Sequence, residues 1–260
     1  MSVVGINEEK SVSMFRKMLV IRKFEEKTSE LFYKGSLPSS VHSYIGQEAV
    51  AVGVMENLYK SDIITSTHRG HGHIIAKGGD LRYIMAEIFG KKTGYCKGKG
   101  GTMHIADTGL NILGANGIVG GGLPIATGAA LSLKLQGKDG VVVCFFGDGA
   151  ANHGTFHESL NLASIWKLPV VFICENNKYM EATPSEEITS VIDISVRAAS
   201  YNIPGILVDG MDVFEVQNST KDSIERARIG GGPSLVECKT YRFREHNEGL
   251  ETYKIIHCQN

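Results

Sequence analysis

Hydrophobic residues occur along this chain in two kinds of run, and the two kinds alternate. Unbroken apolar runs at 141–146 and 170–174 predict buried β-strands over 140–146 and 169–174, and three further short strands are predicted at 63–65, 206–208 and 234–239. Between them, apolar residues recur at the spacing of one helix face. The predicted helices cover residues 8–34, 46–58, 81–89, 117–135, 154–166, 190–200 and 212–229.

Alternating strands and helices predict an α/β fold with a mostly parallel sheet and helices on both faces. Residues 1–260 are expected to form a single domain, since no internal repeat, linker or low-complexity tract interrupts them. Residues 91–116 are predicted to be one long irregular stretch rich in glycine. Such a stretch is usually functional or disordered, so Lys97 and Lys99 are interpreted either as phosphate ligands or as part of a solvated loop.

Composition and charge exclude several classes of function. The net charge is −1 and no apolar run approaches the roughly 20 residues that span a bilayer, so neither nucleic acid nor membrane is an expected partner. The amino-terminal residues are polar and lack the apolar segment of a signal peptide. None of the five cysteines forms a Cys-x-x-Cys pair, and Cys144 and Cys174 lie within the two longest apolar strand predictions. A cytoplasmic location is therefore expected.

Polar side chains follow the two longest strand predictions directly. Gly147-Asp148-Gly149 comes after the first strand and Asn176-Asn177 after the second. Ligands of open α/β sheets bind at the carboxyl ends of the strands, where these side chains would meet. Their oxygens suit Mg²⁺ or Ca²⁺ better than zinc. Glycines at the start of a helix would let the backbone approach a diphosphate, bridged by Mg²⁺ to Asp148 and Asn177, with the Tyr179 carbonyl as a further ligand.

This Asp and Asn signature matches that of thiamine diphosphate enzymes. From about residue 10 to 246, the chain resembles the alpha subunit of thiamine-dependent 2-oxo acid and acetoin dehydrogenases, a pyruvate dehydrogenase-like first component. The other stretches that carry the resemblance are 21–26, 46–49, 68–72, 98–104, 116–120, 208–212 and 240–242.

The resemblance implies a role for each matching position. Mg²⁺ would be held by Asp148, Asn177 and the Tyr179 carbonyl. The diphosphate would accept hydrogen bonds from the backbone of Gly149 and Ala150 and pair with Arg69, and His68, where many relatives carry Tyr, could bond the same group. Gly117 and Val119 would line the aminopyrimidine, and His71 and His246 would face the reacting centre as proton carriers. The remaining histidines considered, His73, His104, His153 and His157, are expected to be structural or surface residues.

The same resemblance implies partners. The glutamate that activates thiamine diphosphate belongs to a beta subunit in this family, so the chain is expected to be inactive alone and to join an alpha2-beta2 heterotetramer with the cofactor at the interface. The acyl unit would pass to the lipoyl group of a separate acyltransferase.

Two departures from the family pattern leave alternatives open. Glu245 precedes His246 where relatives usually carry Gly, and the chain is carboxyl-terminally short relative to the family. Either departure is compatible with a two-carbon transferase subunit that loads an acyl carrier protein, or with a non-catalytic cofactor-binding subunit. Residues 178–184 lack the Gly that pyruvate-type relatives often have after the Tyr, which favours the acetoin branch over pyruvate.

Overall fold

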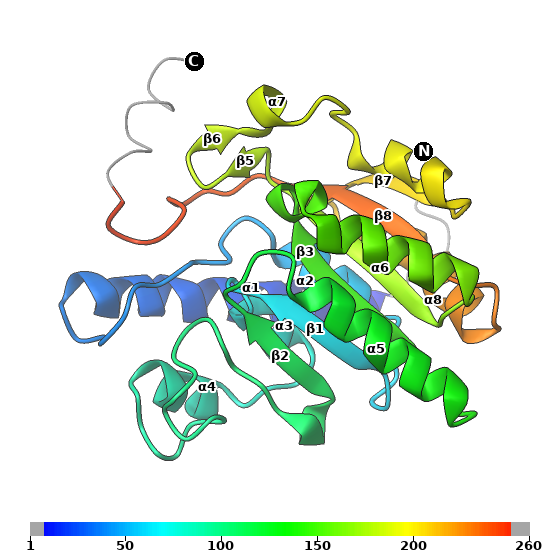
Figure 1. The fold of residues 1–260 in the computed structure, drawn as a ribbon. Helices are drawn as coiled ribbons and strands as arrows, with labels where there is room; N and C mark the ends of the chain where they lie inside the picture. Colours follow the sequence, from blue (N-terminus) through cyan, green and yellow to red (C-terminus); the bar gives the residue numbers. More distant parts are fainter. Residues whose placement is uncertain (1–7, 251–260) are drawn as a thin grey trace.

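The computed structural model describes residues 8–250, which fold around one six-stranded parallel sheet (Figure 1). The strand order is β2-β1-β3-β4-β8-β7, and each neighbouring pair is parallel. The strands are β1 (Ile63–Thr67), β2 (Ile112–Asn116), β3 (Val142–Gly147), β4 (Val170–Asn176), β7 (Gly205–Asp209) and β8 (Ser234–Lys239). The predicted α/β fold with a parallel sheet is therefore confirmed.

Helices cover both faces of this sheet, as expected. They are α1 (Glu8–Tyr33), α2 (Glu48–Met55), α3 (His71–Ala76), α4 (Leu81–Ile88), α5 (Gly122–Leu135), α6 (Gly154–Ile165), α7 (Ser185–Ile188) and α8 (Val213–Arg228). Three 3₁₀ helices, η1 (Thr108–Leu110), η2 (Asp148–Asn152) and η3 (Ile194–Tyr201), and a small antiparallel hairpin of β5 (Tyr179–Met180) and β6 (Thr183–Pro184) complete the described chain.

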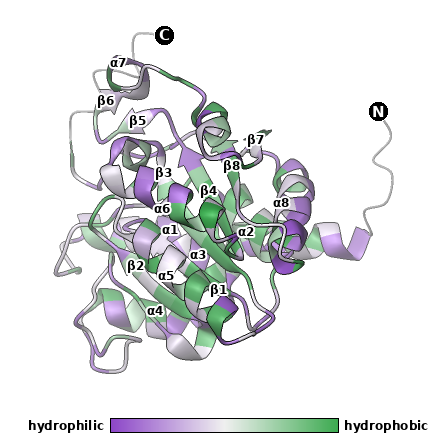
Figure 2. Cartoon of the chain, turned by 45° about the vertical axis from the view of Figure 1, so that its right-hand side comes forward, coloured by the Kyte–Doolittle hydropathy of each residue, from purple (hydrophilic) through white to green (hydrophobic). Residues whose placement is uncertain are grey.

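The central strands are apolar on both faces because each face is covered. On β3, Val143 and Phe145 pack in the core formed with α2, α3, α4 and α8. The alternate residues Val142, Cys144 and Phe146 pack in a second core with α5, α6 and η3. This two-sided burial explains why the strand reads as a continuous apolar run. Figure 2 shows the apolar residues concentrated along strands such as β1 and β4.

Two expectations about individual elements were wrong, and a third was correct only in part. The helix predicted from residue 117 begins at Gly122, because residues 117–121 form a turn in which Gly120 has a φ of +78°. The predicted irregular stretch ends in strand β2, an edge strand that pairs only with β1 and carries too little apolar sequence to stand out. The segment predicted as a helix at 190–200 is the 3₁₀ helix η3.

The glycine-rich stretch that follows α4 is organised by a buried carboxylate. Glu87 accepts hydrogen bonds from the backbone N–H groups of Cys96, Gly98, Gly100 and Gly101 at 2.7 to 3.2 Å. A side chain that satisfies four backbone donors fixes a loop without regular secondary structure. Lys97 and Lys99 remain exposed on the outside of this loop.

The sheet topology places one crevice where ligands of such folds bind. From β1 the chain crosses outward to β2, whereas from β3 it continues to β4 on the other side. The reversal between β1 and β3 opens a space beyond their carboxyl ends. None of the described helices is long and apolar enough to span a bilayer.

Candidate functional site

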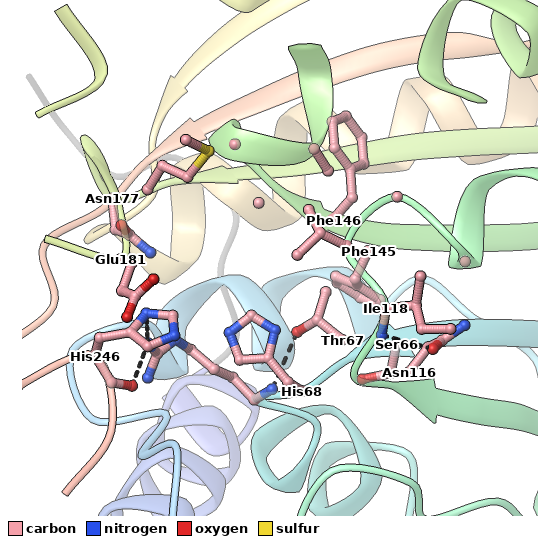
Figure 3. Close-up of a pocket in the computed structure, with 18 of the residues that line it drawn as sticks. Ser66, Thr67, His68, Asn116, Ile118, Phe145, Phe146, Asn177, Glu181 and His246 are labelled. Atoms are coloured by element: carbon pink, nitrogen blue, oxygen red, sulfur yellow. Dashed lines mark hydrogen bonds between the residues drawn. The ribbon is translucent and has the colours of Figure 1, made fainter. Parts of the chain in front are cut away.

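A cavity of about 630 Å³, its open mouth included, lies at this crevice (Figure 3). Its walls come from the carboxyl ends of β1, β2, β3 and β4, and from the segment that follows β8. The residues that line it are Ser66, Thr67, His68, Arg69, Asn116, Ile118, Val119, Gly120, Gly122, Phe145, Phe146, Gly147, Gly149, Ala150, Asn177, Tyr179, Met180, Glu181, Arg242 and His246.

Most of the residues singled out from sequence meet in this lining. Those present are His68, Arg69, Val119, Gly149, Ala150, Asn177, Tyr179 and His246. Asp148 lies directly behind the lining, and Gly117 and His71 are not part of it. Glu245 does not line the cavity either, so its carboxylate is not a wall of the described site.

The environment of Asp148 is suited to a carboxylate that binds a cation. It is 3% exposed, and its Oδ2 atom has no hydrogen-bond partner among the described residues. Burial raises the pKa of Asp148 to about 6, against smaller opposing effects from the backbone N–H groups of Asp148 and Asn177 and from the charges of Arg242 and Lys239. An unpartnered buried carboxylate oxygen is costly unless a charge compensates it. The site therefore fits a hard metal ion at this oxygen.

The second expected ligand is held beside the first by residues distant in sequence. The Asn177 backbone is close enough to Asp148 to influence the pKa of that carboxyl. Its side-chain amide donates to Gln47 Oε1 at 3.2 Å, and the same oxygen accepts from the Thr240 hydroxyl at 3.1 Å. Gln47 is thus a positioning residue for Asn177, a role that sequence reasoning missed. The other member of the pair, Asn176, bonds Glu237 at 2.7 Å and does not line the cavity.

No three His, Cys, Asp or Glu side chains of residues 8–250 are grouped so that they could hold a metal ion. A metal here would therefore depend on Asp148 together with amide and carbonyl oxygens. That donor set is characteristic of Mg²⁺ and Ca²⁺ rather than of zinc.

Two arginines give the cavity a positive wall. Arg69 is 3% exposed, and its guanidinium donates to the Ser43 carbonyl at 2.9 Å and to the His246 carbonyl at 2.6 Å. Arg242 donates to the Glu181 carbonyl at 2.9 Å. Both guanidinium groups also approach His246 Nδ1 at 3.2 Å. Held this way, the two forks are suited to phosphate oxygens.

His42, His68 and His246 form a histidine cluster next to these arginines. Their ring centroids are 5.0 to 5.5 Å apart. Burial first, and then the charge of Arg69, lowers the pKa of His42 to about 4, of His68 to about 2 and of His246 to about 3. The three rings are consequently neutral at physiological pH. Since His246 Nδ1 accepts from both arginines, its Nε2 carries the proton and can donate to a ligand.

The segment that carries Arg242 and His246 is fixed by the loop before α2. Phe243 N donates to the Ile45 carbonyl at 3.3 Å, and Glu248 N donates to the Val41 carbonyl at 2.8 Å. Gly46 permits this approach: its φ is +105°, and a Cβ there would lie 2.1 Å from the Tyr241 carbonyl. His42 enters the site on the same loop, and nothing in its local sequence indicates a role.

The inner wall is largely apolar. Phe145, Phe146, Ile118 and Val119 face the cavity with few polar groups between them. In Figure 3 this wall lies opposite Asn177, Glu181 and His246. The cavity thus combines a charged end with an apolar end, which suits a ligand that has a phosphate group and a ring system.

Two predicted residues lie behind the wall. His71 is fully buried, with Nδ1 3.1 Å from Glu25 Oε1 and its ring edge-on to Phe24. Gly117 packs against His104, whose ring a Cβ at that position would approach to 3.0 Å. Direct roles for these two residues stay predictions.

Comparison with known proteins agrees with this geometry. The sequence model of the family described as "Dehydrogenase E1 component" matches residues 16–254. The alpha subunit of acetoin:2,6-dichlorophenolindophenol oxidoreductase from Bacillus subtilis is 60% identical, over 96% of this chain and 76% of that protein. The subunit of the same name from Cupriavidus necator is 52% identical, over 97% of this chain and 76% of its own length. The pyruvate dehydrogenase E1 component subunit alpha of Rhizobium meliloti is 42% identical, over 95% and 71% respectively.

One solved structure shows the same fold at low identity. It is an enzyme from Mycobacterium smegmatis, described as a putative thiamin diphosphate-dependent enzyme. The TM-score is 0.53 at 17% sequence identity, and the match covers 79% of this chain but only 34% of the solved chain. At this identity the likeness supports the fold alone.

Proposed function

We propose a function that starts from one established fact: this chain belongs to the dehydrogenase E1 component family, as an alpha subunit. We infer that it binds thiamine diphosphate with Mg²⁺ in the cavity described above and forms part of an oxidoreductase acting on acetoin. A pyruvate-like 2-oxo acid is the second substrate candidate. Acetoin comes first because the two relatives at 52% identity or more carry that name, whereas the pyruvate dehydrogenase subunit is 42% identical.

The observation that carries this proposal is the pairing of opposite charges in one cavity. The unpartnered oxygen of Asp148 needs a cation, and Arg69 and Arg242 give the cavity a positive charge that attracts an anion. A metal-bound diphosphate suits both the carboxylate and the arginines. Asp148, Asn177 and the Tyr179 carbonyl would hold Mg²⁺, while Arg69, His68 and the N–H groups of Gly149 and Ala150 would hold the diphosphate.

The apolar wall would take the ring system, with Val119 and Gly117 at or behind it. Thiamine diphosphate supplies nucleophilic addition to a carbonyl and stabilisation of the charge left by carbon–carbon cleavage. The contribution of this chain is to bind and orient. His246 can donate a proton through Nε2, since its Nδ1 is occupied by both arginines.

The described residues form a single domain that we assign to the diphosphate and metal half of the site. Its partner would be a beta subunit that provides the activating glutamate, in an alpha2-beta2 assembly with a cytoplasmic location. The acceptor would be a lipoyl acyltransferase. Two assignments compete with this one: an acyl carrier protein as the acceptor, and a purely cofactor-binding role for the chain. The experiment below distinguishes between them.

The test uses the complex of this chain with its beta subunit. Calorimetry should show uptake of thiamine diphosphate that requires Mg²⁺, and acetoin should reduce an artificial electron acceptor faster than pyruvate does. Asp148→Asn should abolish both signals, while Asp139→Asn, which removes an exposed carboxylate between α5 and β3, should preserve them.

Four outcomes contradict parts of the proposal. Metal-independent binding would refute the Asp148 site. Turnover with pyruvate alone would reassign the substrate. Faster acyl transfer to a phosphopantetheine carrier than to a lipoyl domain would reassign the acceptor, and binding without any turnover would leave the cofactor-binding role.

A further inference from the structure

A buried chain of polar groups runs behind the inner wall of the cavity. Ser66 Oγ lies 2.8 Å from His73 Nδ1, and His73 Nε2 lies 3.1 Å from Glu175 Oε1. The Tyr44 hydroxyl bonds the same glutamate and lies 3.1 Å from His73 Nε2. All four side chains are at most 3% exposed. Buried networks of this kind fix the orientation of their members.

The network has contact with the cavity at two points. Ser66 lines the cavity at the end of β1, next to Asn116 and Phe145 in Figure 3. Phe145 lines it as well, and its ring stacks on His73 with centroids 3.9 Å apart and planes inclined by 23°. A change at His73 is therefore transmitted to two residues of the wall.

The hydrogen bonds determine the tautomer of His73. Tyr44 donates its proton to Glu175 Oε1, so that oxygen is an acceptor. Were Nε2 unprotonated, its lone pair would face the same oxygen at 3.1 Å. In its neutral form, His73 therefore carries its proton on Nε2, and its Nδ1 accepts the proton of Ser66.

This tautomer determines whether the Ser66 hydroxyl acts as a hydrogen-bond donor or as an acceptor toward other groups. With its hydroxyl proton directed to His73, the Ser66 oxygen has only lone pairs to offer to any other partner. A fixed acceptor in an apolar wall favours ligands with an N–H group and disfavours ligands that place an oxygen there. Gly70 leaves room for the arrangement, because a Cβ at that position would lie 2.9 Å from Ser66 Oγ.

We propose that Ser66 accepts a hydrogen bond from the amino group on the ring system of the bound cofactor, and that His73 and Glu175 are positioning residues that keep Ser66 an acceptor. This inference rests on the proposed binding of thiamine diphosphate. It gives His73, which sequence alone interprets as structural, a part in ligand discrimination.

The test measures binding rather than turnover. Three ligands are titrated by calorimetry, with Mg²⁺, into the intact complex: thiamine diphosphate, an analogue in which hydrogen replaces the amino group, and an analogue in which a carbonyl oxygen replaces it. Ser66→Ala should weaken thiamine diphosphate by about fivefold, the worth of one neutral hydrogen bond, and leave the hydrogen analogue unchanged.

His73→Phe provides the second readout. It keeps an aromatic ring against Phe145 but frees the Ser66 hydroxyl to rotate and donate. The preference for the amino ligand over the carbonyl analogue should then shrink, whereas a purely structural role would weaken all three ligands equally. His157→Phe, at a site on α6 that does not line the cavity, is the matched control and should change no ratio.

The outcomes distinguish a failure of this inference from a failure of the proposed function on which it rests. If the wild-type complex fails to bind thiamine diphosphate, the proposed function and this inference both fall. If it binds but Ser66→Ala weakens all three ligands alike, or none of them, only the role of Ser66 is refuted. An unchanged preference in a folded His73→Phe variant refutes the positioning role.

Discussion

Asp148→Asn is expected to stabilise the protein in the absence of metal while it destroys the proposed metal site. Burial raises the pKa of Asp148 from 3.8 to about 6, which corresponds to about 3 kcal/mol of preference for the protonated form. Above pH 6 the carboxylate is ionised, so the native state bears this cost. Asparagine has nearly the same shape and no charge, and it removes the cost.

The net gain is smaller than the full electrostatic term. The amide that this substitution introduces would place an N–H donor near the position where Oδ2 now lacks a partner, and an unsatisfied donor costs about 1 kcal/mol or more. We therefore expect a gain of about 1–2 kcal/mol at about pH 8. For a chain of this size that is a rise in melting temperature of about 2–8 °C.

The raised pKa of Asp148 determines the direction in which stability should change with pH. A group whose pKa is raised on folding contributes stability below its unfolded pKa and loses that contribution as the pH rises through its folded value. Wild-type protein should thus gain stability from Asp148 as the pH falls through about 6 toward 3.8. The advantage of Asp148→Asn should be largest at about pH 8 and shrink toward about pH 4.5.

The assay is thermal unfolding followed by circular dichroism, with a chelator present, at several pH values. The histidine cluster responds to acid in the opposite direction, but equally in both proteins, so their difference isolates Asp148. Asp139→Asn serves as the charge-matched control and should change little. An Asp148→Asn variant that is less stable at pH 8, or a difference that does not vary with pH, would refute the claim that this carboxylate is an uncompensated buried charge.

The remaining predictions concern the positive wall and its support. The pKa values of the histidine cluster are lowered on folding, so its stabilising contribution is present above about pH 6.5 and is lost as the pH falls toward about 4 to 2. Denaturation of Asp148→Asn protein at pH 7.5 and 5.5 should show about 1–2 kcal/mol lost for each of His42 and His68, and less for the more exposed His246. Arg69→Lys should weaken thiamine diphosphate about tenfold or more in calorimetry, because lysine cannot reproduce the fork, whereas Arg82→Lys at an exposed pair should have no effect. Gly46→Ala should lower both the melting temperature and the cofactor affinity, because the added Cβ would collide with a backbone carbonyl. The control Gly35→Ala, at a position with positive φ but open space, should cost only about 1 kcal/mol of stability. Equal effects of the two substitutions would contradict the packing argument.

The parts of this fold that sequence could predict are those in which local pattern and burial agree. β3 and β4 are covered on both faces, so they read as unbroken apolar runs, and the polar residues after them fall at the carboxyl edge of the sheet. Asp148 and Asn177 could be placed near each other for this reason. The edge strand β2 has one neighbouring strand, and its sequence is Ile, Leu, Gly, Ala and Asn. No long apolar run therefore marks it as a strand in the sequence.

The parts that sequence could not supply depend on contacts between distant segments. Gln47 and His42 reach the site because the loop before α2 pairs with residues 243–248, an approach set by Gly46 and not visible in local pattern. Glu175 lies inside a strand whose apolar neighbours give no hint that it bonds a histidine from α3. Closeness within one motif also does not determine which way each side chain points. In the stretch 68–73, His68 lines the cavity, whereas His71 and His73 point into the interior.

The cavity is therefore costly to maintain without its ligand. It holds a buried carboxylate oxygen without a hydrogen-bond partner, whose charge Arg242 and Lys239 compensate less than burial penalises it, and it holds arginines among histidines that burial has made neutral. A metal ion alone would relieve the first imbalance and an anion alone the second, but a metal-bound diphosphate relieves both at once. Because each component improves the environment of the other, their affinities for this site must be coupled, and by thermodynamic reciprocity the factor is the same in both directions. The same reasoning explains why Asp148→Asn should gain stability and lose function together: the charge that destabilises the protein in the absence of metal is the charge that the proposed cofactor complex would require.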